Sequence, residues 1–185
     1  MSGEIKSYLS TEYFIFMSLH TFWEYLKYKW KAKGRHGTHS PFVYDFVEQV
    51  ALNKHVIDKQ YIIDDLNLPL RYENLISRMA AHYDYNNIML VPMKNDRATT
   101  NRADVLIFDD AEPLLWTNLL KEHKPILNNN GAVVVINIHK SAIHTFGWQQ
   151  LRNSNSVRMS MDLYSIGILF FKEEFKIQQH FILKC

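Results

Sequence analysis

The sequence predicts an α/β protein in which helices cover both faces of a central, largely parallel β-sheet. Three observations support this fold class. Short, continuous apolar runs, typical of strands buried on both faces, occur at 88–93, 103–108 and 132–136. Segments with a helical spacing of apolar residues alternate with such runs. Three more strand-like runs end the chain with connections too short for helices, so we expect those strands to be largely antiparallel.

Composition narrows the classes of protein to which this chain can belong. Its 185 residues are 47% hydrophobic and carry a formal net charge of +2, which suits one globular unit and argues against nucleic acid as a partner. The only cysteine is Cys185, which excludes a disulfide framework within the chain, and we expect a cytoplasmic protein. We identify no targeting signal, and the apolar run 13–19 is too short to span a bilayer.

The first helix is expected over residues 11–32, where neither proline nor glycine occurs. Its apolar residues recur every three or four positions, the spacing of one helical face. They are Phe16, Leu19, Trp23, Leu26 and Trp30. We expect this stripe to pack on the core and the neighbouring lysines to lie in water. The alternative is that aromatic and lysine side chains together contact a membrane surface or nucleic acid.

Further helices are expected before the sheet. Ser40 followed by Pro41 is typical of a helix N-cap with proline at the first helical position. A short helix is predicted around 58–67, and the next helix has a continuous apolar face. That face comprises Tyr72, Leu75, Ile76, Met79 and Tyr83. We therefore divide the chain into a helical extension at 1–69, packed on the core, and a sheet-containing core at 70–185.

The core is predicted to alternate strands and helices and then to end in strands. The expected elements, in order, are strands 88–93 and 103–108, helix 112–127, a turn at 128–131, strand 132–136, helix 141–152, and strands 157–164, 166–171 and 180–184. The turn is predicted because three asparagines and a glycine, residues common in turns, follow one another.

Both ends of the chain carry motifs that resemble one enzyme family. The first is His36-Gly37-Thr38-His39-Ser40-Pro41-Phe42-Val43-Tyr44, and the second comprises the closing segments "SMDLYSIGILFF" and "QHFILK". They resemble the class I S-adenosylmethionine-dependent methyltransferases, and more narrowly a bacterial branch that opens with a long helix and an HG-hydrophobic-HSPFVF signature. The resemblance implies a three-layer, Rossmann-like methyltransferase fold with antiparallel strands at its C-terminal edge.

The segment after the first strand departs from that family. Its members place an acidic residue and a glycine-rich turn there, because only glycine lets backbone N–H groups approach the cofactor closely. In this chain Leu90 stands in the acidic position, Pro92 in that of the first glycine, and Lys94 follows in a loop without glycine. Further strand–helix units of the family, each about 30 residues long, do not fit between Val91 and Ala103, so the sheet is reduced. We expect no cofactor, and S-adenosylmethionine only if the site has been rebuilt.

Candidate site residues follow the later strands, at the carboxyl ends where open α/β sheets place their ligands. Asp109 and Asp110 follow one strand, and Asn137 and His139 follow the next. By the resemblance, Ile136 and Asn137 stand where the family has an acidic pair, so no metal is expected. For the aspartates we expect helix capping, with ligand binding as the alternative. For His139 we expect a surface loop, with a general base as the alternative.

The signature near residue 40 supplies three more candidates. The resemblance marks His36, His39 and Ser40 as family residues, which on physical grounds would close a pocket at the sheet edge. The two histidines are three residues apart, a spacing compatible with a metal, but no third ligand is visible in the sequence and none is expected.

Three hypotheses about function follow. The first is a methyltransferase-like protein without catalytic activity and without the usual S-adenosylmethionine site, which binds a ligand, another protein or a second copy of itself. The second is an active methyltransferase with a rebuilt cofactor site. The third is a peripheral membrane or scaffold protein that uses the aromatic N-terminal helix, an interpretation that we do not favour.

Overall fold

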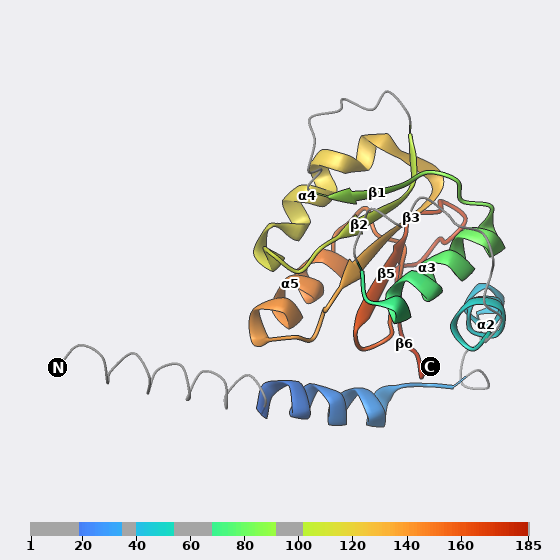
Figure 1. Ribbon diagram of the computed structural model, residues 1–185. Helices are drawn as coiled ribbons and strands as arrows, with labels where there is room; N and C mark the ends of the chain where they lie inside the picture. The colour runs from blue at the N-terminus through green and yellow to red at the C-terminus, as the bar shows by residue number, and fades with distance from the viewer. Residues whose placement is uncertain (1–18, 35–39, 54–67, 92–101, 185) are drawn as a thin grey trace.

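A mixed six-stranded β-sheet forms the centre of the protein (Figure 1), for which a computed structural model describes residues 19–34, 40–53, 68–91 and 102–184. The strand order is β1-β2-β3-β5-β4-β6. The strands are β1 (Ile88–Val91), β2 (Ala103–Phe108), β3 (Leu127–Ile136), β4 (Met159–Asp162), β5 (Ile166–Phe170) and β6 (Gln179–Ile182). Of these, β5 runs antiparallel to both of its neighbours, and the others point the same way. The predicted α/β class is confirmed.

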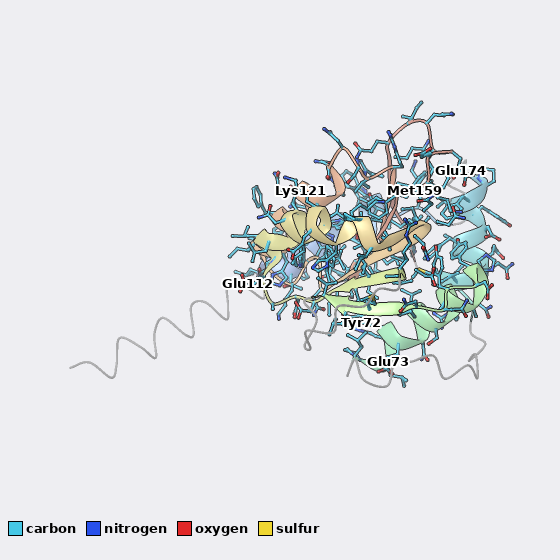
Figure 2. The ribbon with its side chains drawn as sticks, turned by 90° about the horizontal axis from the view of Figure 1, so that it is seen from above. Tyr72, Glu73, Glu112, Lys121, Met159 and Glu174 are labelled. Carbon is cyan, nitrogen blue, oxygen red and sulfur yellow. The ribbon has the colours of Figure 1, made fainter. Side chains whose placement is uncertain are left out.

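Helices cover both faces of the sheet and make the protein three-layered. On one face lie α2 (Pro41–Phe46), which continues into a π-helical turn, and α3 (Leu70–Tyr83). On the other lie α4 (Trp116–His123) and α5 (Ala142–Arg152). Figure 2 shows this arrangement from above, with Tyr72 and Glu73 of α3 on the opposite side of the sheet from Lys121 of α4.

The apolar runs of the sequence form these strands because both sheet faces are buried. Along β2, Val105 and Ile107 face the layer of α2 and α3, whereas Leu106 and Phe108 face that of α4 and α5, and all four side chains are buried. A strand with one exposed face alternates apolar and polar residues. A strand that is buried on both faces has apolar residues at successive positions instead. The helix starts predicted at Ser40 and Ser141 are also confirmed, since each hydroxyl accepts a hydrogen bond from the backbone N–H three residues later.

The predicted turn at 128–131 is wrong, because these residues belong to β3. The Asn128 side chain bonds the Asp104 carboxylate of β2. A Cβ atom at Gly131 would lie 2.7 Å from the carbonyl oxygen of Asp104, so glycine permits close approach of the two strands. The β2–β3 register shifts between Ala103, which pairs with Leu127, and Val105, which pairs with Ala132. The polar residues 128–130 lie within this shift, inside β3.

The predicted helix at 112–127 is only partly α-helical. Pro113 begins a 3₁₀ turn (Pro113–Leu115) before α4, and another (Lys124–Ile126) follows it. Pro125 lies in that second turn, and proline lacks the N–H that an α-helical bond requires. Both prolines therefore restrict α4 to the central eight residues.

We expected the closing strands to be largely antiparallel, which is right for β5 and wrong for β6. β6 forms the edge of the sheet and pairs in parallel with β4. Met159 of β4 has Phe170 of β5 on one side and Gln179 of β6 on the other. Because β5 runs opposite to β4, the chain leaves β5 at the end of the sheet where β4 begins. A short connection can then cross the end of β4 and start a parallel strand.

The N-terminal helix is described over residues 19–31, and the expectation that its apolar stripe packs on the core is wrong. Leu19, Trp23, Leu26 and Trp30 are 41–92% exposed, whereas Tyr28 on the opposite side is buried. The reason is that both apolar sheet faces are already covered by other helices, which leaves the polar carboxyl end of the sheet for this helix (Figure 1). Residues 11–18 and the predicted helix at 58–67 lie outside the described residues. No helix of the described ranges is long and apolar enough to cross a membrane.

Candidate functional site

Polar side chains gather at one edge of the sheet, where β2, β3 and β4 have their carboxyl ends. Asp109 and Asp110 follow β2, Asn137 and His139 follow β3, and Asp162 ends β4. The parallel direction of the strands brings these residues to the same edge. The structure thus brings the predicted candidates of two strands together and adds a third strand end.

Asn137 connects two strand ends with helix α3. Its Nδ2 donates a hydrogen bond to Asp110 Oδ2 over 2.9 Å, and its Oδ1 accepts one from Tyr72 Oη over 2.8 Å. Its backbone has φ 57°, in the left-handed region where asparagine is several-fold enriched. Asn137 N also donates to the Ser165 carbonyl over 2.6 Å. The side-chain amide is therefore held in place by contacts from both of its polar atoms.

Asp110 is the anionic centre of this network. Lys140 Nζ lies 2.6 Å from its Oδ2, the same oxygen that accepts from Asn137. Burial by itself raises the pKa of the Asp110 carboxyl, but the hydrogen bonds from Lys140 and Asn137 and the lysine charge outweigh burial and hold that pKa below its ordinary value. Asp110 is therefore ionised at neutral pH and already paired within the protein.

Neither aspartate caps a helix, so the capping expectation is wrong. Asp109 Oδ1 accepts a hydrogen bond from Ala111 N over 3.1 Å and closes a local turn, and its carbonyl accepts one from the Trp116 indole over 2.9 Å. Helix α4 begins only at Trp116 and has no side-chain N-cap. The 3₁₀ turn that starts at Pro113 separates the aspartates from the helix start.

His139 is nearly buried and held from two sides, which corrects the expectation of a surface-loop histidine. Its side chain is 10% exposed, and its Nε2 lies 2.8 Å from Asp162 Oδ2. Its Nδ1 lies 3.1 Å from Thr145 Oγ1, and the ring of Tyr164 stacks on it at 5.7 Å between centroids. A general base needs a ring nitrogen that faces the substrate. Both nitrogens of His139 have protein partners, so the arrangement favours positioning over proton transfer.

A second histidine, His144, is enclosed in the same way. Its Nδ1 lies 2.7 Å from Ser141 Oγ, the N-cap of α5, and its Nε2 lies 3.1 Å from the Asp110 carbonyl. Burial lowers the pKa of His144, and the nearby Lys140 charge acts in the same direction, against the opposing effect of Asp110. A serine next to a histidine is a possible nucleophile and base. In this site, however, both ring nitrogens hold the loop between β3 and α5.

A small cavity of about 230 Å³ lies between the N-terminal helix and this edge of the sheet. Its lining residues are Glu24, Lys27, Tyr28, Lys31, His139, Gln149, Arg152, Asp162 and Ile182. Glu24 Oε2 lies 4.0 Å from His139 Nδ1, so the N-terminal helix contributes a carboxylate to the wall. Pockets for drug-sized ligands measure roughly 300–1,000 Å³, and this cavity suits a smaller polar molecule.

The other predicted site residues are not part of this edge as described. His36, His39, Pro92 and Lys94 lie outside the described residues. Ser40 caps α2 and lines a separate hollow of about 650 Å³, together with Met159 and Phe175. Leu90 lies within β1, where it pairs with Ile107 and is partly buried.

Sequence reasoning missed several residues of the network. The helical spacing places Tyr72 on the apolar face of α3, yet its hydroxyl bonds Asn137. Asp162 carried a usable signal, because an acidic residue at the end of an otherwise apolar strand requires a partner when buried. Glu24 and Lys140 carried no such signal in the sequence, because charged residues are common on exposed helices and in loops.

No metal cluster and no relative point to a function. Within the described ranges, no group of three histidine, cysteine, aspartate or glutamate side chains is placed to hold a metal ion. Comparison with known protein families, curated proteins and solved structures finds no match to this chain. The class that the fold defines is an α/β protein with a mixed six-stranded sheet and a polar network at one sheet edge.

Proposed function

We propose that this protein is a degenerate relative of the class I S-adenosylmethionine-dependent methyltransferases, which has lost the cofactor site and binds a ligand or a partner instead of transferring methyl groups. The observation that carries the proposal is the closed network at the sheet edge. Asp110, a carboxylate at the carboxyl end of β2, is already paired with Lys140 and Asn137.

The topology supports kinship with that family. Three parallel strands are followed in the sheet by one antiparallel strand and then by β4, in the order β1-β2-β3-β5-β4. The family closes its sheet in a similar way, with an antiparallel strand inserted beside the last parallel ones. The motifs that resemble the family in sequence, "SMDLYSIGILFF" and "QHFILK", form β4, β5 and β6.

The chemistry of the edge supports the loss of catalysis. A cofactor ribose needs a carboxylate that is available to its hydroxyl groups. By the resemblance, the strand that would carry this carboxylate does not fit between Val91 and Ala103. At the end of β2, Asp110 Oδ2 already accepts hydrogen bonds from Asn137 and Lys140. His139 and His144 have both ring nitrogens engaged. These contacts hold the strand ends and the loop after β3 together, which supports a structural role for Asp110, His139 and His144.

Calorimetric titration of the purified full chain with S-adenosylmethionine tests this proposal. We expect no binding at micromolar concentrations. A thermal unfolding scan with and without the compound provides a second readout, because a ligand that binds only the native state raises the midpoint temperature. Micromolar binding would contradict the proposal, and its weakening by Asp110→Asn would favour an active methyltransferase with a rebuilt site.

A further inference from the structure

The N-terminal helix at 19–31 attaches to the protein through its polar side. Tyr28 Oη donates a hydrogen bond to the Leu183 carbonyl, and the Thr21 carbonyl accepts one from Tyr164 Oη over 2.9 Å. His20 Nε2 lies 3.2 Å from Thr145 Oγ1 of α5. A parallel β-bridge between Lys33 and Leu183 continues the attachment just after the helix. The polar side of the helix is therefore the side that contacts the rest of the protein.

The apolar side of the same helix faces away from the domain. Leu19, Phe22, Trp23, Leu26 and Trp30 follow one another at intervals of three, one, three and four residues, which places them on one face. Trp30 is 92% exposed and Trp23 58% exposed. Figure 1 shows the helix, in blue, along the lower border of the domain, with no described element on its outer side.

Lysines border this apolar face on both sides. At 100° per residue, Lys29 lies beyond Phe22 on one border, and Lys27 and Lys31 lie beyond Trp23 on the other. All three are exposed. The acidic residue of the described helix, Glu24, lies toward the protein and pairs with Lys27 over 2.7 Å. The outer face is thus apolar in the middle, cationic at both borders and free of acidic side chains over residues 19–31.

We propose that this face binds an anionic lipid surface, with the helix lying in the plane of the membrane interface. Tryptophan is the side chain that most favours the level of the lipid headgroups, and lysines can extend past it to the phosphates. A second copy of the chain is a poorer complement, because it would bring lysines against lysines with no carboxylate between them. The cytoplasmic leaflet, rich in anionic lipids, has the complementary charge.

The arrangement differs from that of a free amphipathic helix, whose polar side faces water. In this protein the polar side is bound to the carboxyl end of the sheet, next to the cavity lined by Glu24 and His139. Binding to lipid would therefore place this edge of the sheet close to the membrane surface. The inference does not depend on the proposed loss of cofactor binding, because it rests on a different face of the molecule.

Sedimentation of the full chain with vesicles tests the proposal. We compare vesicles of phosphatidylcholine and phosphatidylserine in equal parts with vesicles of phosphatidylcholine alone, and expect at least about tenfold stronger retention by the anionic ones, weakened by added salt. Tryptophan emission gives a direct readout. Of the four tryptophans, Trp116 and Trp148 are buried, so a blue shift on addition of vesicles reports Trp23 and Trp30.

Variants separate the apolar and electrostatic contributions. Trp23→Ala with Trp30→Ala should weaken retention by more than about tenfold, given the apolar area of two indoles. Lys29→Glu with Lys31→Glu should weaken it by at least about fivefold per lysine. The matched controls are Leu114→Ala, which alters another exposed apolar residue, and Lys121→Glu on α4, which reverses another exposed charge. Neither control should change retention.

Three results would overturn the proposal. The first is equal retention of the wild type and the tryptophan variant, and the second is no retention of the wild type by either kind of vesicle. The third is a wild-type dimer in sedimentation velocity that Trp30→Ala converts to a monomer, which would identify a second copy as the occupant. Circular dichroism of each variant verifies that loss of retention does not reflect unfolding.

Discussion

His139 Nε2 lies 2.8 Å from Asp162 Oδ2, and this contact ties the loop after β3 to the end of β4. Between these two strands lies β5, the strand that runs in the opposite direction. Asp162 also accepts a hydrogen bond from Tyr164 N over 2.9 Å, which holds Tyr164 at φ 67°. One buried carboxylate thus organises the tight turn between β4 and β5 and orients the histidine above it.

Replacement of Asp162 tests how much this contact contributes to stability. Asp162→Ala leaves His139 and the Tyr164 N–H without their acceptor, and should lower the free energy of unfolding by about 2–3 kcal/mol. Asp162→Asn keeps an acceptor but loses the charge, so its effect should be smaller. Urea denaturation provides the measurement. The control Glu174→Ala, at a carboxylate that is 67% exposed, should change stability by less than about 0.5 kcal/mol.

Asn137→Asp tests the network between β2 and β3. The substitution replaces the amide that donates to Asp110 by a second carboxylate, and should lower stability by about 2 kcal/mol at neutral pH. Repulsion between the two carboxylates raises their pKa in the folded state, so the loss is present above that pKa and shrinks as the pH falls and one of them is protonated. Asn155→Asp, at an exposed position, is the control. A loss that is the same at acidic and neutral pH would contradict the explanation.

The dependence of protein stability on pH should reflect the protonation of His144. Burial lowers its folded pKa below the ordinary value of 6.5. As the pH falls through that value, the unfolded chain takes up a proton before the folded protein does, so stability decreases until the folded His144 also titrates. His144→Gln remains neutral and should make this decrease shallower. Denaturation midpoints over a series of mildly acidic pH values measure it, and an unchanged slope would speak against a buried, neutral His144.

Gly147→Ala tests the packing of α5 on the segment before α4. By helix propensity alone, this change would stabilise the protein by about 0.5–1 kcal/mol. A Cβ atom at Gly147, however, would lie 2.4 Å from the Pro113 carbonyl oxygen. We therefore expect a loss of about 1–3 kcal/mol, as for other overpacked sites. Gly34→Ala is the matched control, because a Cβ atom at Gly34 would meet nothing within 4 Å, and it should have little effect.

Local signals in the sequence predicted most elements because these signals act over a few residues. The run at 103–108 forms β2 with the bounds expected for it, and Ser40 and Ser141 begin helices as N-caps. The candidate residues Asp110 and Asn137 do meet at one edge, as the parallel direction of their strands requires. The polar residues at 128–130 led to the wrong prediction of a turn, because their partners in the sheet, such as Asp104, are distant in sequence.

The sequence by itself determined that this chain is an α/β protein with doubly buried strands and an aromatic, lysine-rich N-terminal helix. Only the tertiary structure decided which side of that helix is buried, that His139 meets Asp162, and that β6 lies beside β4. Hydrophobicity makes burial of an apolar face favourable but does not supply a surface to bury it against. Once other helices have covered both faces of the sheet, its polar end is what remains, and the helix binds there through Tyr28 and Thr21.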